Sequence, residues 1–283
     1  MVKNPKWARG SNQYVQRTRA SGNDSSPESR LILDRSEIVR TLEDTGVTWS
    51  QFDVERIRPS EVERIRFRFK THLPELIWNT AALEGNNFTL PEVKTLLEGV
   101  TVGGRRLDDV DQILALSEAY NRLDELVGAG EFALTKTVSD ELHALLARHE
   151  AIECGSFRGE RAVTGGGTVR LASGGVVEGT PHGEGGELLR EHFDYLISFL
   201  DSIDDPRKRA LIYFASAVRR QFYFDGNKRT ARLMMTGELI SSGFEVVSIP
   251  FARKLEFNEA LDLLFSRDDA TDLVRFLSTC VLD

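Results

Sequence analysis

Apolar residues recur every three or four positions through most of the chain after residue 29, with polar residues between them. This spacing gathers the apolar side chains on one face of a helix, so it predicts a mainly helical protein with a shared core. The segments that follow this spacing are 31–42, 60–86, 92–98, 108–126, 135–147, 187–200, 206–222, 228–241, 257–265 and 271–281.

Residues with special backbone preferences mark several of the predicted helix ends. Asp34 or Ser36 is placed to cap the first helix, and Gly46 to end it. Gly85, followed by two asparagines, ends the helix at 60–86. Pro91 falls in the first turn of the next helix, where a missing N–H is tolerated. The helical segments are therefore separated by recognisable turns.

The pattern changes between residues 155 and 186, where eleven glycines replace the helical spacing. A run of β-type residues lies within this stretch and predicts a glycine-rich hairpin or flap. The run consists of Thr168, Val169, Arg170 and Leu171. We therefore predict an all-α fold class with one small β-hairpin.

Composition narrows the class of protein further. The 283 residues are 41% hydrophobic and 28% charged, a balance typical of globular domains, and no apolar run approaches the roughly 20 residues that span a bilayer. The N-terminus lacks the apolar core of a signal peptide, and Cys154 and Cys280 suggest neither a disulfide framework nor a metal site. The five histidines form no metal-ligand pattern. We expect a reduced, cytoplasmic protein without a metal cage.

The net charge of −8 is unevenly distributed along the chain. Residues 1–30 hold six basic and two acidic residues, so the remainder, with 30 basic and 42 acidic residues, carries −12. The first 28 residues are rich in Ser, Asn and Gly and lack periodicity, which predicts a disordered basic leader. The acidic body makes nucleic acid an unlikely main substrate.

The stretch 221–232 reads Gln-Phe-Tyr-Phe-Asp-Gly-Asn-Lys-Arg-Thr-Ala-Arg and places a short turn directly before a helix. A helix start presents free N–H groups and the positive end of the helix dipole, so it favours anions. Arg229 and Arg232 lie within the first two turns of that helix and can reach further phosphate groups of a nucleotide. The stretch is therefore a candidate phosphate site.

This stretch resembles the motif HxFxDGN(G/K)RxxR of the Fic (Fido) family. The matching positions are Asp225, Gly226, Asn227, Lys228, Arg229 and Arg232. Two positions depart from the motif, because Gln221 stands at the catalytic histidine and Tyr223 at the phenylalanine. Phe222 also replaces the usual proline, and we expect it to pack in the core with Phe224, Leu233 and Met234.

Three further features agree with this resemblance. Residues 80–86, beginning at Thr80 and including Glu84, are similar to the inhibitory-helix signature (S/T)xxxE(G/N) of one subclass. Leu142 and His143 stand where the family often carries a Leu-His pair, and residues 155–158 resemble the start of the family's flap. The resemblance divides the chain into the leader at 1–28, an N-terminal helical region at 29–104 with the inhibitory helix at about 60–86, and a Fic core at 105–283.

The resemblance also implies roles for the motif residues. Asp225 would hold Mg²⁺, Gly226 would let the backbone approach the phosphates, and Asn227 with Arg229 would contact the α- and β-phosphates of ATP. Lys228 is either a further phosphate neighbour or, as we favour, a solvated helix residue. Glu84 would pair with Arg232 and so take the guanidinium that holds the γ-phosphate.

The implied activity is protein adenylylation, in which AMP passes from ATP to a Ser, Thr or Tyr hydroxyl of a target protein. The flap at 155–186 would align an extended segment of that target by β-augmentation, through the run that begins at Thr168. The target is not identified by the sequence. Family members often dimerise through helices, so a homodimer is a further expectation, whereas no membrane partner is expected.

Gln221 changes the expected mechanism, because a glutamine amide does not titrate and so cannot serve as the general base. Three interpretations stay open. The chain is a nucleotide-binding relative without catalysis, or it transfers AMP slowly with a base from elsewhere, or Gln221 is an introduced substitution. His182 in the glycine-rich stretch is a candidate substitute base, although a surface role is favoured.

Two hypotheses from other functional classes also stay open. The chain is an interaction module or toxin-like regulator without nucleotide chemistry, in which case the flap and acidic body form a partner surface. Alternatively it is a phosphotransferase similar to the Doc branch of the family, which shares the run from Asn227 to Thr230. Gly226, where that branch usually has alanine, and the Glu84 helix both favour the adenylyltransferase reading.

Overall fold

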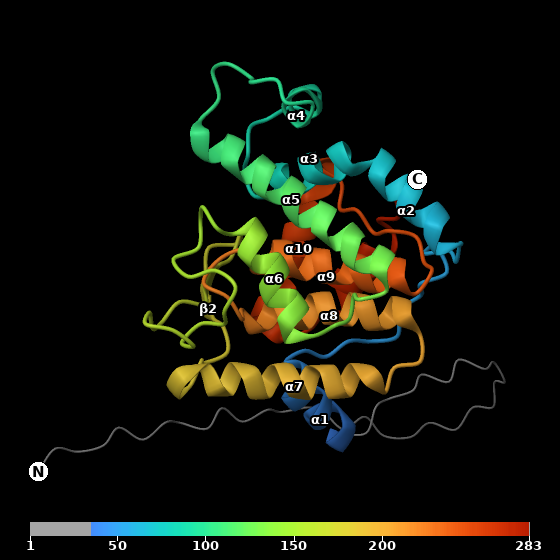
Figure 1. Cartoon of the computed structure of the whole chain (residues 1–283). Coiled ribbons are helices and arrows are strands. Elements are labelled where there is room, and N and C mark those ends of the chain that lie inside the picture. The colour runs from blue at the N-terminus through green and yellow to red at the C-terminus, as the bar shows by residue number, and fades with distance from the viewer. Residues whose placement is uncertain (1–34, 283) are drawn as a thin grey trace, which may run out of the picture. The chain divides into compact units, whose positions relative to one another are not determined.

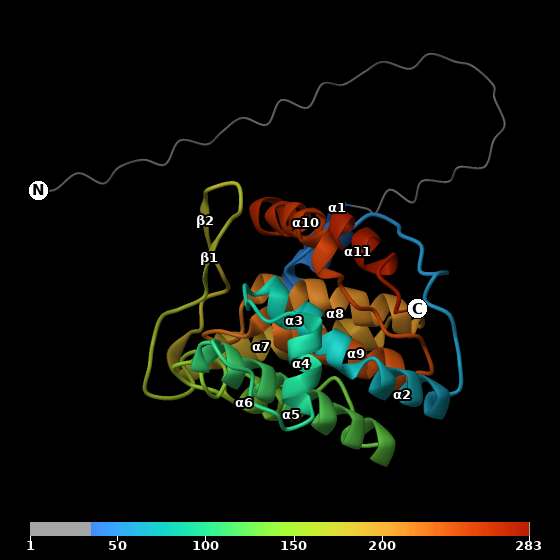
Figure 2. The same ribbon diagram turned by 90° about the horizontal axis from the view of Figure 1, so that it is seen from above.

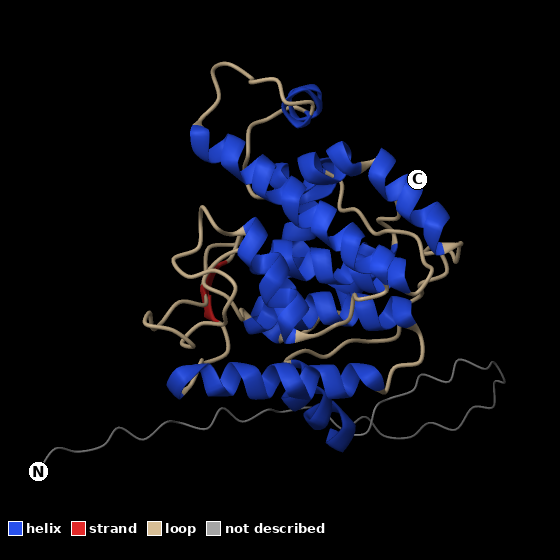
Figure 3. Ribbon diagram, viewed as in Figure 1, coloured by secondary structure: helices blue, strands red, loops and turns tan. Residues whose placement is uncertain are grey.

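The computed structural model describes residues 35–282, which contain eleven α-helices and one two-stranded hairpin (Figures 1 and 3). This confirms the predicted all-α fold class with a small β-hairpin. The predicted leader, residues 1–28, and the first residues of the helix predicted at 31–42 lie outside the described residues. Apart from the segment 60–86, the remaining helices begin and end within a few residues of the predicted positions.

The helices and strands follow one another along the chain with the hairpin in the middle. They are α1 (Arg35–Thr45), α2 (Val62–Thr71), α3 (Leu73–Leu83), α4 (Leu90–Leu97), α5 (Leu107–Ala129), α6 (Lys136–Leu146), β1 (Thr168–Arg170), β2 (Val176–Glu178), α7 (Glu187–Asp201), α8 (Pro206–Arg220), α9 (Asn227–Ser241), α10 (Lys254–Arg267) and α11 (Thr271–Ser278).

Helices α8 and α9 form the centre of the described part, joined by the loop at 221–226 and packed side by side (Figure 1). Both are buried on nearly all sides, as expected for helices at the middle of a bundle. Helices α5 and α6 pack on α9, while α7, α10 and α11 pack on α8. The loop between the two central helices is thereby held from both sides.

The sequence explains several of the helix ends. Asp205 caps α8 by accepting the N–H of Arg207 at 3.0 Å, with Pro206 as the first helical residue. Thr89 and Glu92 form a reciprocal capping box at the start of α4. Gly130 ends α5 at a φ of +70°, a conformation that glycine adopts without strain.

The helix predicted at 60–86 is two helices, which corrects the single inhibitory helix of the sequence analysis. Helix α2 ends at Thr71 and α3 begins at Leu73, with His72 at the junction. Pro74 explains the break, because it lacks an N–H donor and its ring clashes with a preceding helical turn. The segment that carries Glu84 is therefore α3 alone, which ends at Leu83 with Glu84 as its C-cap.

The hairpin pairs Val169 with Val177 in an antiparallel register. It stands beside the helical bundle and extends towards α10, as Figure 2 shows. The exposed strands bury little apolar surface of their own, so contacts to other elements must hold the hairpin in place. Within the described residues, no helix combines the length and the apolar character that crossing a membrane requires.

Candidate functional site

A pocket of about 470 Å³ lies between the hairpin and the N-terminus of α9. Its walls come from four parts of the chain: the hairpin at 168–172, the loop and helix start at 224–229, one face of α10, and the two side chains Glu84 and Gln221. The sequence-predicted motif, flap and inhibitory residue therefore meet at one cavity. Arg232 and Thr80 are the exceptions, because neither lines this pocket.

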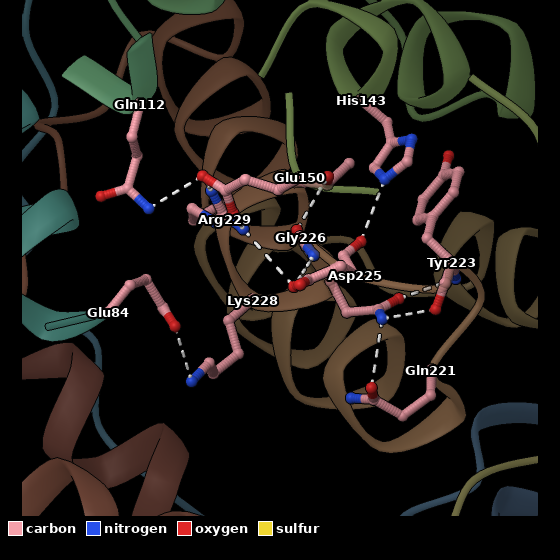
Figure 4. Close-up of polar contacts among 12 residues, drawn as sticks. Glu84, Gln112, His143, Glu150, Gln221, Tyr223, Asp225, Gly226, Lys228 and Arg229 are labelled. Carbon is pink, nitrogen blue, oxygen red and sulfur yellow. Dashed lines mark hydrogen bonds and ion pairs between the residues drawn. The ribbon is translucent and has the colours of Figure 1, made fainter. Parts of the chain in front are cut away.

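The loop before α9 is held by hydrogen bonds within a few residues of sequence (Figure 4). The side chain of Asn227 accepts the Tyr223 N–H at 2.8 Å and donates to the Tyr223 carbonyl at 2.7 Å. Gly226 adopts a φ of +70°, which favours glycine. The amide of Asn227 thus turns into its own loop, and the N–H groups at the start of α9 face the pocket side.

Gln221 lies on the pocket wall, but its side chain is engaged at both ends. Its Nε2 donates to the Val218 carbonyl at 2.6 Å, and its Oε1 accepts from Asn227 Nδ2 at 3.1 Å. Its backbone is left-handed, with a φ of +54°, and ends α8. The residue at the motif histidine position therefore braces the turn, and its amide has no titratable proton.

The three cations of α9 have different partners. Lys228 Nζ lies 3.0 Å from Glu84 Oε2, and Arg229 forms a two-pronged pair with Glu150 at 2.8 and 2.5 Å. The Arg232 side chain is only 3% exposed, and none of its three guanidinium nitrogens has a hydrogen-bond partner within the described residues. This corrects two expectations, because Glu84 pairs with Lys228 instead of Arg232, and Lys228 is not a freely solvated side chain.

The electrostatics of Glu84 reflect this cluster. Burial raises the pKa of Glu84, but the charges of Lys228, Arg229 and Arg232 outweigh it, so that the pKa lies below its usual range. The carboxylate is therefore ionised, yet its Oε1 has no hydrogen-bond partner among the described residues. A buried anion facing three cations can be exchanged for a ligand anion of similar charge.

Arg232 is enclosed by the N-terminal helices. Burial lowers the pKa of Arg232, whereas the nearby Tyr120 and Glu84 oppose that shift. Thr80, the first residue of the inhibitory signature, shares a hydrogen bond of 3.0 Å with the Tyr120 hydroxyl. Thr80 therefore anchors α3 to α5, and it makes no direct contact with the motif cations.

Asp225 and His143 form the upper edge of the loop (Figure 4). The Asp225 side chain is 61% exposed at the pocket, where one Oδ1 accepts the Gly226 N–H. His143 donates from Nε2 to the Asp225 carbonyl at 3.0 Å, because its Nδ1 accepts the Gly155 N–H at 2.9 Å. Burial lowers the pKa of His143 to about 4, so the ring is neutral and structural.

The aromatic departures from the motif are accommodated in the core. The Tyr223 ring stacks on His143 at 3.8 Å, and its hydroxyl bonds Ser139 and Asp140 at 2.7 and 2.8 Å. Burial raises the pKa of Tyr223 far above its usual range. Phe222 stacks on Phe157, and Leu233 and Met234 are buried as expected. Phe224 differs, because it is only partly buried and lines the pocket.

The flap is fixed at its two ends by side chains from outside the hairpin. At the stem, Arg158 donates to the carbonyls of Gln221, Gly166 and Thr180 at 2.6, 2.8 and 2.7 Å. At the turn, Asp262 of α10 accepts two backbone N–H groups, those of residues 172 and 173, at 3.0 and 2.8 Å.

The remaining histidine candidate lies elsewhere. His182 bonds the backbone of Gly183 and Gly165 and is not on the pocket wall. No histidine lines this pocket among the described residues, and no group of three or more His, Cys, Asp or Glu side chains there could hold a metal. A general base from His182 is therefore not supported by its position.

Sequence reasoning missed two acidic residues of this site. Glu150 is 79 residues from its partner Arg229, and Asp262 is about 90 residues from the flap turn it holds. Neither lies in a recognisable motif. The only local sign is that Asp262 shares one helical face with Asn258, Leu261 and Phe265, all of which line the pocket.

Several known proteins are similar to this chain over most of its length. No family model matches the chain. A protein adenylyltransferase Fic of Drosophila willistoni is 26% identical over 268 residues, covering 91% of this chain and 50% of its own length. One of Drosophila ananassae is 29% identical over 209 residues, covering 72% of this chain and 39% of its own. The chain thus spans about half the length, or less, of the curated relatives it matches.

Solved structures share the fold. A Fic domain containing signaling protein of Bacteroides thetaiotaomicron has a TM-score of 0.64 at 22% identity, covering 80% of this chain and 88% of its own. The Fic-1 protein of C. elegans has a TM-score of 0.61 at 20% identity, covering 77% and 67%. Fold and motif together define a Fic-type helical domain. The chain is similar to Fic proteins in its sequence and shares the fold of the Fic (Fido) family.

Proposed function

We propose that the pocket binds the triphosphate of ATP and that the chain is an autoinhibited Fic-type protein adenylyltransferase whose transfer step is impaired. The observation that carries the proposal is which partners the cations Lys228, Arg229 and Arg232 have in the described residues. Lys228 is neutralised by an internal carboxylate, and Arg232 is buried without any partner in the described residues. A buried guanidinium that lacks an anion is costly, and a bound phosphate would relieve that cost.

The geometry of the pocket suits a polyphosphate. The N–H groups and dipole at the start of α9 attract one phosphate, and the cations of the next two turns attract the others. Asp225 is exposed at the pocket edge, so it fits a Mg²⁺ ion held by one carboxylate and by phosphate oxygens. That ion would neutralise part of the phosphate charge.

Glu84 would act as the inhibitory residue. Its carboxylate occupies Lys228 and shares the field of Arg229 and Arg232, so an incoming γ-phosphate must displace it. This differs in partner from the expected pair with Arg232, but the principle of competition for a cation is the same. Replacing Glu84 by a neutral residue should therefore strengthen ATP binding.

The transfer step has a defined requirement. A target hydroxyl oxygen would attack the α-phosphorus, the bond to the β-phosphate oxygen would break, and pyrophosphate would leave. The hydroxyl proton needs an acceptor, and Gln221 offers none, because its amide is neutral and bonded within the turn. Loss of a general base typically slows a reaction by about 10²- to 10⁴-fold.

The test is labelling of proteins by ATP carrying ³²P on its α-phosphate. We compare three forms in the presence of Mg²⁺ and a cell lysate: Glu84→Gly, Glu84→Gly with Gln221→His, and the latter with Arg229→Ala. The form with histidine should label proteins at least tenfold more than Glu84→Gly alone, consistent with a restored general base. Labelling should disappear in the Arg229→Ala form.

A second function is favoured by one observation, the engagement of Gln221 at both ends. A chain in which that residue only braces the turn would bind nucleotide without transferring it. Tight ATP binding by the histidine form without any labelled band would support this binding-only function. Absence of both binding and labelling would rule out a nucleotide site altogether.

A further inference from the structure

Glu150 is a second internal carboxylate that pairs with a cation of α9, and nothing in the motif predicts it. It lies in the loop after α6 and pairs through both oxygens with Arg229, the first arginine of the motif (Figure 4). The Arg229 side chain is 3% exposed, and hydrogen bonding to Glu150 keeps the pKa of Arg229 high although burial lowers it. The pair therefore fills a strong anion position.

A chain of hydrogen bonds joins Glu150 to the segment that carries Glu84. Gln112 of α5 donates from Nε2 to Glu150 Oε1 at 2.9 Å. The other end of the same amide, Oε1, accepts from Asn86 Nδ2 at 2.9 Å. Asn86 lies two residues after Glu84 and directly after the positive-φ Gly85. The Glu150 carboxylate is thus linked by hydrogen bonds to the segment that carries Glu84.

We propose that Glu150 is a second inhibitory residue, which holds Arg229 as Glu84 holds Lys228, and that a polyphosphate must displace both carboxylates to bind. This inference rests on the proposed function of the pocket as a phosphate site. It adds to that function a second inhibitory carboxylate, so that the two come from separate parts of the chain, the end of α3 and the loop after α6.

The two partners of the Glu150 pair differ in how easily they can move. Arg229 is buried in the helix, whereas residues 148–150 are exposed at the surface and the Glu150 side chain is 26% exposed. The Glu150 carboxylate can therefore turn into water at little cost, while Arg229 stays to receive a phosphate. A carboxylate that can turn into water without disturbing the core is able to give up its place to a ligand anion.

The experiment measures affinity for ATP and for inorganic tripolyphosphate by titration calorimetry, without reliance on catalysis. Glu150→Gln keeps the size of the side chain but removes its charge and replaces one acceptor oxygen by a donor. The matched control is Glu118→Gln, which removes a carboxylate bound to Arg148 in the same loop but away from the motif. Melting curves of all variants check that they are folded.

We expect Glu150→Gln to bind both probes on the order of tenfold more tightly, as for loss of one charge-assisted competitor. Glu84→Gln should gain by a similar factor, the double variant should exceed either single variant, and Glu118→Gln should match the unmodified chain. Gln112→Ala should gain less than Glu150→Gln, because it only loosens the carboxylate.

The results separate this inference from the function on which it rests. If Glu84→Gln binds ATP more tightly and Glu150→Gln does not, Glu150 is structural and the inference is wrong, while the proposed function stands. If Glu150→Gln gains affinity for tripolyphosphate but no form binds ATP, competition by Glu150 is supported and the proposed ATP binding is wrong. If no form binds either probe, both fail.

Discussion

The two walls of the pocket are built in opposite ways. The loop before α9 is held by bonds within seven residues, from Gln221 to Asn227, and sits between two buried helices. The flap opposite buries little surface and depends on Arg158 and Asp262, which approach its stem and its turn from elsewhere. The loop has its own local network, to which His143 and Arg158 add one side-chain bond each, whereas the flap has no such network and depends on distant residues.

This difference bears on how each wall can respond to a ligand. Motion of the loop would break its own hydrogen bonds and disturb the core, so it behaves as a fixed template. Motion of the flap turn requires only the release of its exposed contacts with Asp262, which places the turn, unlike the stem held by Arg158, at the low-stability end of the molecule. Substitutions at the two walls should therefore have distinct signatures.

Arg158 should give the largest effect, because it is the one side chain that joins the two walls. Arg158→Met keeps the length but removes the donor to the carbonyls of Gln221, Gly166 and Thr180, at a cost of about 1–3 kcal/mol for each acceptor left unsatisfied away from water. We expect a loss of about 4 kcal/mol in the free energy of unfolding, measured by urea denaturation.

Arg161→Met is the control for this substitution, since Arg161 is exposed a few residues away. It should change stability by less than about 0.5 kcal/mol. Equal stability of Arg158→Met and Arg161→Met would mean that the walls are not joined through Arg158.

His143 tests the loop side of this comparison through the pH dependence of the free energy of unfolding. Burial lowers the pKa of His143 from 6.5 to about 4, so between these values the unfolded chain binds a proton that the folded chain excludes. Stability should therefore fall as the pH drops from 6.5 towards 4, by about 3 kcal/mol from this residue. Above pH 6.5 the contribution of His143 should be constant.

Urea denaturation at several pH values between 4 and 7 tests this, with His143→Gln as the comparison. The variant should be less stable at pH 7 but show a shallower decline, because it lacks the titrating ring. Parallel declines for the two proteins would show that His143 is not the group responsible.

Asp262 should give the smallest effect on global stability and the most local one. Hydrogen bonds from the flap turn keep the pKa of Asp262 low although burial raises it, so the charged form holds the turn. Asp262→Asn should cost less than about 1 kcal/mol overall, as for an exposed charged contact. Hydrogen exchange should nevertheless speed up at 168–178 and leave 221–229 unchanged. Faster exchange in both segments would mean that the flap and the loop open together.

Much of the fold followed from the sequence because helical periodicity and capping are local signals. The bounds of α5, α6, α7 and α9 were predicted to within a few residues, and the single strand run marked the hairpin. The break between α2 and α3 was missed because the apolar spacing continues across Pro74, the residue that causes it. Periodicity reports a buried face and not the continuity of a helix.

In the candidate site, too, the local features were predicted and the pairings between distant residues were not. The motif located the loop, the cations and Glu84, because these form a contiguous pattern. Their pairing was not predictable, since Lys228 and Arg232 compete for the same carboxylate and only the packing of α3 on α5 decides between them. Glu150 belongs to no pattern, and its meeting with Arg229 arises from the path of the loop after α6.

The left-handed backbone at Gln221 has a consequence for how this site can change over generations. That conformation is costly for branched side chains, and Gln221 holds it here through bonds within the turn. Codons for the two residues differ only in the third base. One point mutation can therefore exchange a titrating ring for an inert amide while the turn keeps its shape, so the lineage can lose or regain a catalyst without first losing its fold.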